Sequence, residues 1–447
     1  MKYLRTFILV MLLAFTVFPA IAENVDFTVD GFSYAITSTT DLTVEVVQGP
    51  NQAVVTVPST VVFNKRTFRV TGIGSEAFLD RENLESIDMP SITYISDGIF
   101  IFNPYHNAWY GAFDGCKKLS QVNMPAAKSI GDGAFHDCYA LTSVSLPSAT
   151  SIGDGAFSEC KALTSVTLPA VKFIGKDAFY GCDALTSISL PAATSIGESA
   201  FYGCDALTSV TLPAATSIGE SAFYGCDALT SVSLPAATSI GYEAFRGCDS
   251  LASVSMPAAT SIGDSAFNYC KALTSVSMPA ATSIGFGAFS GCDSLTSVSM
   301  PAATSIDGDA FSGCQFLSDI YVGNDPAYCY YGSPFDNVTY ATATLHVPVG
   351  CTSKYKAADH WKQFAFISED YDPTGIKNTN ADKVKVSSGN GNVNITGLKN
   401  GEKVEFYSVN GQLLGTSVAN AGAVSFKTSE RVVICKMAGT SIKVLVK

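Results

Sequence analysis

The stretch from Ile196 to Ser217, IGESAFYGCDALTSVTLPAATS, decides the fold because it returns along the chain with a period of 22 residues. A fixed period of this length is the signature of a solenoid, in which each unit packs only against its neighbours. The sequence therefore predicts eleven stacked units over residues 73–323. The leading isoleucines are Ile73, Ile95, Ile130, Ile152, Ile174, Ile196, Ile218, Ile240, Ile262, Ile284 and Ile306.

Two periodicities alternate inside each unit. Ala200, Phe201 and Cys204 follow helical spacing, whereas Val210 and Leu212 alternate as the inward residues of a strand do. Each unit is expected to supply a short helical turn and one strand, and the strands of successive units should pair in parallel. Stacking then joins the apolar residues of all units into one core.

One unit carries an insertion. Ile95 and Ile130 are 35 residues apart, so 13 extra residues lie within 96–112. A solenoid coil extrudes such residues as a loop, and this loop has the aromatic types that dominate interface hot spots. The alternative is that the loop folds back onto the N-terminal cap and shields the core. The candidate binding residues here are Phe100, Phe102, Tyr105, His106, Trp109 and Tyr110.

A second candidate binding element is a short aromatic row. Tyr180, Tyr202 and Tyr224 occupy one repeat position in three successive units, and Arg246 follows at the same position. Stacking should place these side chains side by side, with the cation at one end. The alternative is a half-exposed row of convex-face residues without a ligand.

Ten cysteines recur at one position of the repeat. In a secreted chain, such a series would favour a disulfide interpretation, but equivalent Cβ atoms in stacked units point in parallel and do not converge. We expect these thiols to be reduced and buried as small apolar groups. A bridge between Cys329 and Cys351 is open but has no supporting motif. The ten are Cys116, Cys138, Cys160, Cys182, Cys204, Cys226, Cys248, Cys270, Cys292 and Cys314.

The sequence offers no pattern typical of catalysis, metal binding or nucleic-acid binding. The four histidines are scattered, so no metal and no cofactor are expected, and the strand hydroxyls such as Ser209 and Thr211 have no histidine base beside them. We therefore name no catalytic residue and do not expect an enzyme. The formal net charge is -12 and Lys and Arg form no patch, which disfavours nucleic acid as a partner.

The first residues resemble a secretory signal. Lys2 and Arg5 precede an apolar run over residues 7–18, and Ala20 and Ala22 form a small-x-small cleavage site. We expect a signal peptide over residues 1–22, cleaved after Ala22, and no transmembrane segment afterwards because no later apolar run is long enough. The expected location is secreted or at the bacterial cell surface.

The repeat pattern Ile-Gly-x-x-Ala-Phe-x-x-Cys-x-x-Leu-x-x-Val-x-Leu-Pro resembles the BspA-type leucine-rich repeats of surface proteins in Bacteroides-like bacteria. The resemblance covers Ile73 to about Val322. Residues 23–72 resemble the β-rich N-terminal cap of that family, and residues 324–370 resemble its C-terminal cap. Such caps cover solenoid ends that otherwise expose core and unpaired strand edges.

The composition changes after a linker at residues 371–380. Residues 381–447 alternate as strands around an Asn410-Gly411 turn, which predicts a small β-sandwich. The segments 401–407 and 442–447 resemble C-terminal sorting domains of type IX secretion, although the usual Gly-x-Tyr is replaced around Arg431-Val432-Val433. The alternative is a plain C-terminal β-sandwich module.

The resemblance implies a secreted or cell-surface protein that binds an extracellular protein or glycan, for example in adhesion to host or neighbouring cells. The C-terminal domain would then attach it to the outer-membrane surface. Two other classes stay open: an envelope spacer without a specific ligand, and, more remotely, a secreted enzyme, which would need a clustered polar pocket.

Overall fold

The computed structural model describes residues 25–103, 106–371 and most of 385–445. The expected signal peptide and nearly all of the expected linker lie outside the described residues. The chain divides into two units, the first formed by residues up to 318 with 327–339, and the second by residues 319–326 with 340–447. No helix in the described part of the chain has the length and apolar character needed to cross a membrane.

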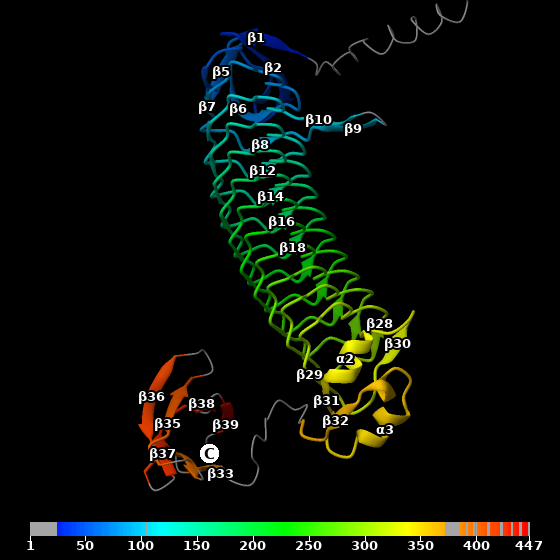
Figure 1. Ribbon diagram of the computed structural model, residues 1–447. Coiled ribbons are helices and arrows are strands. Elements are labelled where there is room, and N and C mark those ends of the chain that lie inside the picture. The colour runs from blue at the N-terminus through cyan, green and yellow to red at the C-terminus, as the bar shows by residue number, and fades with distance from the viewer. Residues whose placement is uncertain are drawn as a thin grey trace, which may run out of the picture. The chain divides into compact units, whose positions relative to one another are not determined.

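The first unit is a rod of stacked turns, and each turn contributes two strands, not one (Figure 1). We number repeat positions from the leading isoleucine, so that Ile196 is position 1 and Ser217 is position 22. Position 22 and the next position 1 form a two-residue strand of one parallel sheet, in which Ile196 pairs with Ile218. Positions 14–16 form a three-residue strand of a second parallel sheet, in which Val210 pairs with Val232.

The narrow sheet continues from the N-terminal cap through β8 (Tyr94–Ile95), β12 (Ser129–Ile130), β14 (Ser151–Ile152), β16 (Phe173–Ile174), β18 (Ser195–Ile196), β20 (Ser217–Ile218), β22 (Ser239–Ile240), β24 (Ser261–Ile262), β26 (Ser283–Ile284), β28 (Ser305–Asp307) and β30 (Tyr328–Tyr330). The wider sheet of the rod has β13 (Ser143–Ser145), β15 (Ser165–Thr167), β17 (Ser187–Ser189), β19 (Ser209–Thr211), β21 (Ser231–Ser233), β23 (Ser253–Ser255), β25 (Ser275–Ser277) and β27 (Ser297–Met300). Before it, β4 (Val54–Thr56), β7 (Ser86–Asp88) and β11 (Gln121–Asn123) pair in parallel.

The segment expected to contain a helical turn is a series of tight turns. Cys204 N–H donates to the Phe201 carbonyl at 3.3 Å, but Gly203 N–H donates to Tyr224 of the next turn at 2.8 Å. Positions 4 and 8 have left-handed backbone, with φ of 50° at Ser199 and 66° at Gly203. A helix cannot continue through left-handed residues. Some backbone N–H groups therefore donate within their own turn, and the others donate to a carbonyl of the next turn.

Glycine at position 2 permits the close approach of successive turns. A Cβ built on Gly197 would lie 2.6 Å from the carbonyl carbon of Gly175. Position 3 then adds a side-chain bond in some units, because an aspartate there accepts from the backbone N–H of the same position in the next turn. Asp132 accepts from Asp154 at 2.7 Å and Asp154 accepts from Lys176 at 2.7 Å.

The core is a set of parallel side-chain columns. Twelve buried phenylalanines stack from Phe78 to Phe335 with ring centroids 4.8 to 5.4 Å apart. Beside them the repeat thiols are buried, and each donates to the phenylalanine carbonyl of the preceding unit, as Cys204 does to Phe179 at 3.2 Å. The expected burial of the repeat cysteines is confirmed, and their reduced state stays a prediction.

The N-terminal end of the rod is a β-rich cap, in which β3 pairs in parallel with β6 and β6 leads into the narrow sheet at β8. The cap strands are β1 (Phe27–Val29), β2 (Phe32–Ser38), β3 (Thr43–Gln48), β5 (Thr60–Phe63) and β6 (Arg66–Ile73). The insertion forms an antiparallel hairpin of β9 (Ile99–Asn103) and β10 (His106–Tyr110), which projects from the side of the rod in Figure 1.

The second unit contains a parallel group of strands with short helices and a separate β-sandwich. The first group has β29 (Asp319–Val322), β31 (Thr344–His346), β32 (Phe366–Ser368), α3 (Thr352–Ala357) and the 3-10 turn η1 (Trp361–Gln363), while α2 (Asn337–Thr342) spans the boundary between units. The sandwich has one sheet of β33 (Lys385–Gly389), β34 (Asn392–Thr396) and β37 (Ala423–Lys427), and another of β36 (Leu413–Val418), β35 (Lys403–Tyr407), β38 (Val432–Met437) and β39 (Thr440–Leu445).

The sandwich has its own core, which includes Ile395, Val404 and Phe406. Phe406 stacks on Phe426 with ring centroids 4.1 Å apart. The Asn410-Gly411 turn and Arg431 lie outside the described residues. The described strands therefore form a β-rich C-terminal region with a core separate from the phenylalanine column.

Candidate functional site

Position 7 of the repeat is one of the positions at which the residue type varies between units. It lies in the tight turns between two buried residues, directly after the phenylalanine of position 6 and two residues before the cysteine of position 9. Unlike the inward positions, it changes in charge and in size from unit to unit. We call this set the position-7 row: Asp114, His136, Ser158, Tyr180, Tyr202, Tyr224, Arg246, Asn268, Ser290 and Ser312.

The predicted aromatic row forms the middle of the position-7 row. The rings of Tyr180 and Tyr202 stack with centroids 5.0 Å apart, and those of Tyr202 and Tyr224 with centroids 4.6 Å apart. The Arg246 guanidinium lies over the Tyr224 ring at 5.7 Å and pairs with Glu243. The structure thus brings together all four residues that the sequence analysis selected for this element.

The surroundings of this row raise the pKa of two of its phenols. Burial, followed by nearby acidic groups, raises the pKa of Tyr180 above its usual value. Burial also raises the pKa of Tyr202, with the adjacent tyrosines as the next cause. Each tyrosine is half-buried, with its ring face covered by the next ring. The row therefore offers hydroxyl groups and ring edges beside one fixed positive charge.

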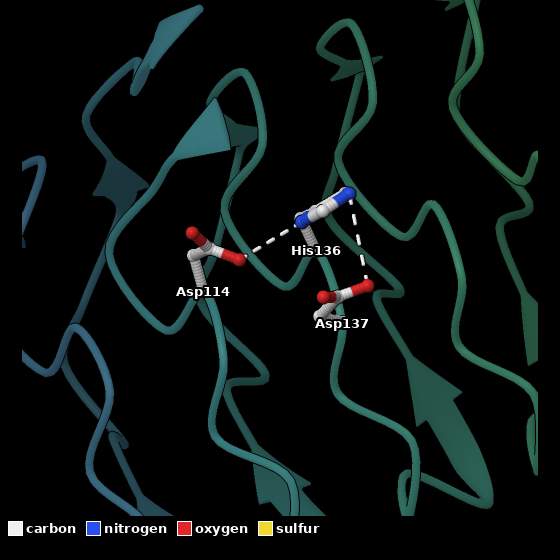
Figure 2. Close-up of side chains that lie close together, drawn as sticks. All are labelled: Asp114, His136 and Asp137. Atoms are coloured by element: carbon white, nitrogen blue, oxygen red, sulfur yellow. Dashed lines mark hydrogen bonds and ion pairs between the residues drawn. The ribbon is translucent and has the colours of Figure 1, made fainter. Parts of the chain in front are cut away.

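The beginning of the position-7 row is an acidic cluster around a histidine (Figure 2). His136 Nδ1 lies 2.9 Å from Asp114 Oδ1, and Nε2 lies 3.8 Å from Asp137 Oδ1. Asp114 stands on one turn, and His136 and Asp137 stand on the next. The ligand atoms of these three side chains all lie within 4.8 Å of one another, so they could hold a metal ion.

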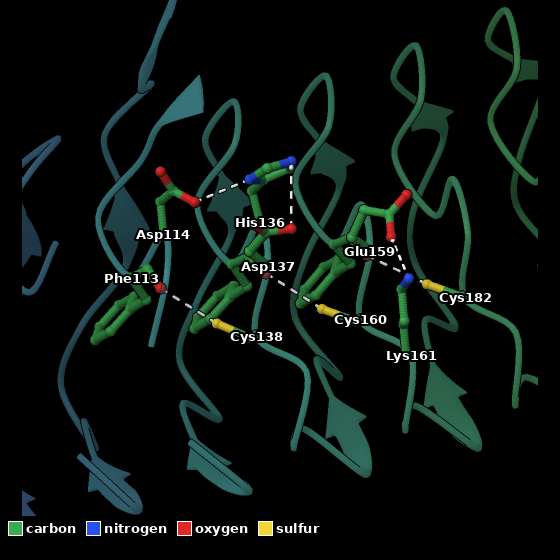
Figure 3. Close-up of polar contacts among 11 residues, drawn as sticks. Phe113, Asp114, His136, Asp137, Cys138, Glu159, Cys160, Lys161 and Cys182 are labelled. Carbon is green, nitrogen blue, oxygen red and sulfur yellow. Dashed lines mark hydrogen bonds and ion pairs between the residues drawn. The ribbon is translucent and has the colours of Figure 1, made fainter. Parts of the chain in front are cut away.

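The surroundings of this cluster are acidic. Figure 3 shows that Glu159 of the following turn pairs with Lys161, at 3.1 Å, while Cys138 below donates to the Phe113 carbonyl at 3.2 Å. Burial raises the pKa of the Asp114 carboxyl despite its bond to His136. Burial opposes the charged form of His136, but Asp114 and the other acidic groups outweigh it and raise the pKa of that imidazole.

The interpretation of the histidines as scattered and unpaired is wrong for two of them. His346 Nε2 lies 3.0 Å from Asp319 and Nδ1 lies 2.7 Å from Asp370, and its ring stacks on Tyr321. The period concealed these contacts because Asp114 and His136 are 22 residues apart, yet they are spatial neighbours. Comparing residues at one repeat position in successive units is the signal that would have found the pair of Asp114 and His136.

The hairpin places its aromatic residues in two different settings. Trp109 packs against Phe100 with ring centroids 4.8 Å apart. A Cβ on Gly133 or Gly155 would lie 2.9 or 2.5 Å from Trp109 atoms, so its indole rests on two glycines of the turns that follow the insertion. The alternative of folding back onto the N-terminal cap is therefore wrong for Trp109, which lies on the opposite side of the insertion.

Two described aromatic side chains of the hairpin are exposed to solvent. Phe100 is 45% exposed and Tyr110 is 37% exposed. Phe102 and His106 have described backbones in β9 and β10, but their side chains, and Tyr105 altogether, lie outside the described residues. Only Phe100, Trp109 and Tyr110 of the predicted loop residues can therefore be placed as side chains.

A shallow groove that the sequence analysis missed lies on the strands β4, β7 and β11. Val54, Asp88 and Asn123 are among its lining residues, and Asn123 donates to Asp88 at 2.7 Å. The signal was present in the sequence, since these three strands depart from the Ser-x-Ser or Ser-x-Thr pattern of the later units.

These features define a class of protein, the leucine-rich-repeat solenoid with parallel strands. The chain belongs to the family described as "BspA type Leucine rich repeat region", whose model matches residues 59–107, 109–226 and 194–318, more than half of the chain. No curated protein matches it.

Solved structures with similar folds come from several bacteria. A leucine-rich repeat protein of Bacteroides ovatus is 23% identical, with a TM-score of 0.44, and the match covers 75% of this chain and 98% of that one. A leucine-rich cell surface protein of Faecalibacterium prausnitzii is 26% identical, with a TM-score of 0.36, and covers 66% and 94%. The leucine-rich repeat protein of T. pallidum is 27% identical, with a TM-score of 0.39, and covers 45% and 90%.

Proposed function

We propose that this chain is a secreted or cell-surface binding protein that recognises an extracellular protein or glycan, as in adhesion to host or neighbouring cells. Membership of the BspA-type family supports a binding role. The F. prausnitzii protein with a similar fold is itself described as a cell surface protein. Residues 1–22 act as the export signal, and residues 381–447 act as a sorting domain for surface attachment.

The observation that carries this proposal is the stacked row of Tyr180, Tyr202 and Tyr224 with Arg246. Tyrosine and arginine are the residue types that contribute most to binding at interfaces. Their geometry limits what can bind, because each inner ring face is covered by a neighbouring ring. A ligand lies along the ring edges, accepts hydrogen bonds from the phenol hydroxyls and places an acceptor or negative group near the guanidinium.

The hairpin supplies a second contact region. Phe100 and Tyr110 are exposed, whereas Trp109 is held against the rod. The indole fixes the hairpin so that its exposed aromatic side chains need not be ordered again when a partner binds.

Binding of the purified chain beginning at Glu23 to an array of glycans and extracellular-matrix proteins tests this proposal. Tyr202→Ser places at position 7 the residue that Ser158 and Ser290 already provide, so the scaffold tolerates it. We expect saturable binding to at least one ligand, weakened about tenfold or more by Tyr202→Ser.

The matched control is Phe286→Asp, which removes a 45% exposed aromatic residue from position 3 and restores the aspartate found there in other units. It should bind like the original chain. The absence of any saturable ligand would favour the envelope spacer. If both variants weakened ligand binding equally, the row would not be part of the binding surface.

A further inference from the structure

The cluster of Asp114, His136 and Asp137 includes none of the stacked tyrosines of the aromatic row. Its residues come from two adjacent turns of the rod. The backbone fixes both turns: His136 N–H donates to the Gly133 carbonyl at 3.0 Å, and Gly115 N–H donates to the His136 carbonyl at 3.1 Å. Asp137 has a left-handed φ of 58°, at a position where glycine is usual. An aspartate in that conformation costs backbone strain that glycine would avoid.

The charge around His136 is unbalanced. Asp80, Asp137 and Glu159 all act electrostatically on Asp114 or His136, and Lys161 is already paired with Glu159. The side chains of His136 and Asp114 are only 19% and 14% exposed, so water screens these charges poorly. The cluster therefore favours an additional positive charge.

His346 also lies between two carboxylates, but its contacts differ from those of His136. At His346 the carboxylates of Asp319 and Asp370 bond to different ring nitrogens, at 3.0 and 2.7 Å, so each nitrogen has its own partner. At His136 one nitrogen has a close carboxylate, and the contact of the other to Asp137 is long at 3.8 Å. Among the described residues, only the His136 group has its potential ligand atoms within 4.8 Å of one another.

We propose that Asp114, His136 and Asp137 bind one divalent transition-metal ion of the Zn²⁺ class, which ties two adjacent turns of the rod together. One imidazole nitrogen and two carboxylates match the ligand preference of Zn²⁺ better than that of Ca²⁺ or Mg²⁺, which favour all-oxygen sites. Around a tetrahedral metal at ~2.1 Å the ligand atoms lie about 3.4 Å from one another, so the three side chains must draw closer together when the ion binds. Water completes the coordination.

Titration of the untagged, EDTA-treated full chain with ZnCl₂, followed by calorimetry, tests this proposal. Two variants use residues that the repeat already accepts: His136→Ser, as at Ser158, and Asp137→Gly, as at Gly181. The control is His346→Gln, which removes the other carboxylate-paired histidine. We expect one Zn²⁺ per chain, binding weakened about tenfold or more in both cluster variants, and binding unchanged in the control.

A second measurement uses Co²⁺ alone. Bound at this cluster, it should give a visible absorption spectrum that His136→Ser abolishes. Three results would each overturn the proposal: no Zn²⁺ binding by the original chain, Zn²⁺ binding unaffected by His136→Ser, or binding lost in His346→Gln instead. Thermal unfolding of the metal-free variants at the same temperature as the metal-free original shows that the fold is intact.

Discussion

Gly197 and Gly203 stand in the same unit but are needed for different physical reasons. Gly197 has no room for a Cβ, since one would lie 2.6 Å from the backbone of the preceding turn. Gly203 has nothing within 4 Å of such a Cβ, but its φ is 66°. The repeat keeps glycine at one position for space and at the other for conformation.

Substituting alanine at each position separates these two causes. Gly203→Ala should lower the free energy of unfolding by about 1 kcal/mol, the cost of a left-handed L-residue. Gly197→Ala should cost about 3 kcal/mol because two turns must move apart. Chemical denaturation of both variants measures the difference, and equal costs would show that the turns separate easily.

Asp177 is a titrating group at a left-handed position. Burial raises the pKa of this carboxyl to about 6 from 3.8, against the opposing effect of Lys176, while Glu198 and Asp154 raise it further. The folded protein therefore holds this proton more tightly than the unfolded chain does. Stability from this residue is lost as pH rises from about 4 through about 6.

Asp177→Ser, which copies Ser199, should remove this loss. We expect the variant to be more stable by about 1 kcal/mol near pH 7.5, a value reduced for partial solvation of the carboxylate. The gain should shrink as the pH falls toward about 4. Unfolding midpoints measured across this range test the sign, and a gain that is independent of pH would show that ionisation of the Asp177 carboxyl does not cause it.

At the scale of elements, the period and the wider strand of each unit could be predicted, but the narrow strand could not. The strand at positions 14–16 alternates apolar and polar residues, as Val210 shows between Ser209 and Thr211. The narrow strand has only two residues, such as Ser195 and Ile196, and two residues are too few to show a pattern of alternating apolar and polar side chains. Its existence depends on pairing between neighbouring turns, which a single unit does not reveal.

The hairpin shows the same limit at a binding element. Its aromatic residues predicted a binding role, but no local pattern indicated which of them faces the rod. The seat for Trp109 consists of Gly133 and Gly155, where later units have side chains such as Ser199. No local pattern in the sequence links the insertion to the glycines one and two units later, because their contact exists only in the folded rod.

Gly155→Ser should displace Trp109 because its Cβ would lie 2.5 Å from the indole Nε1. We expect tryptophan fluorescence to shift to longer wavelength as the indole enters water. Gly287→Ser is the control, since Gly287 has the same φ of 59° and its Cβ would meet nothing closer than 3.6 Å. Trp361 is buried and common to all variants, so unchanged spectra in Gly155→Ser would mean that the hairpin is not seated.

At the scale of the whole molecule, the solenoid could be predicted because its core repeats, whereas the candidate sites could be predicted only in part because they occur where the repeat varies. The sequence identified the tyrosine row by its regular spacing. It missed the carboxylates around His136, since those residues differ in type and lie on different turns. In a nearly constant repeat, the residues that differ from the pattern are easy to find, but the sequence does not show what their side chains contact.

The C-terminal sandwich should be dispensable for the fold of the rod. Its core residues, such as Ile395 and Phe406, form a cluster of their own. A chain ending at Asp370 should therefore keep the thermal transition of the rod and its partner binding, while losing surface attachment in the native host. Calorimetry and the ligand array measure the first two outcomes, and lost binding in a folded truncation would make the sandwich part of the recognition surface.

The parallel pairing of successive turns also determines how the rod responds to tension. The hydrogen bonds between neighbouring strands run along the stacking direction, as in the pairing of Ser209 with Ser231. A pull along that direction opens the turns one after another, like a zipper, because no strand has to slide past its neighbour. A protein anchored at one end and attached to a partner at the other would lengthen in small steps under fluid shear, and single-molecule stretching would record evenly spaced, low-force events about one 22-residue unit apart.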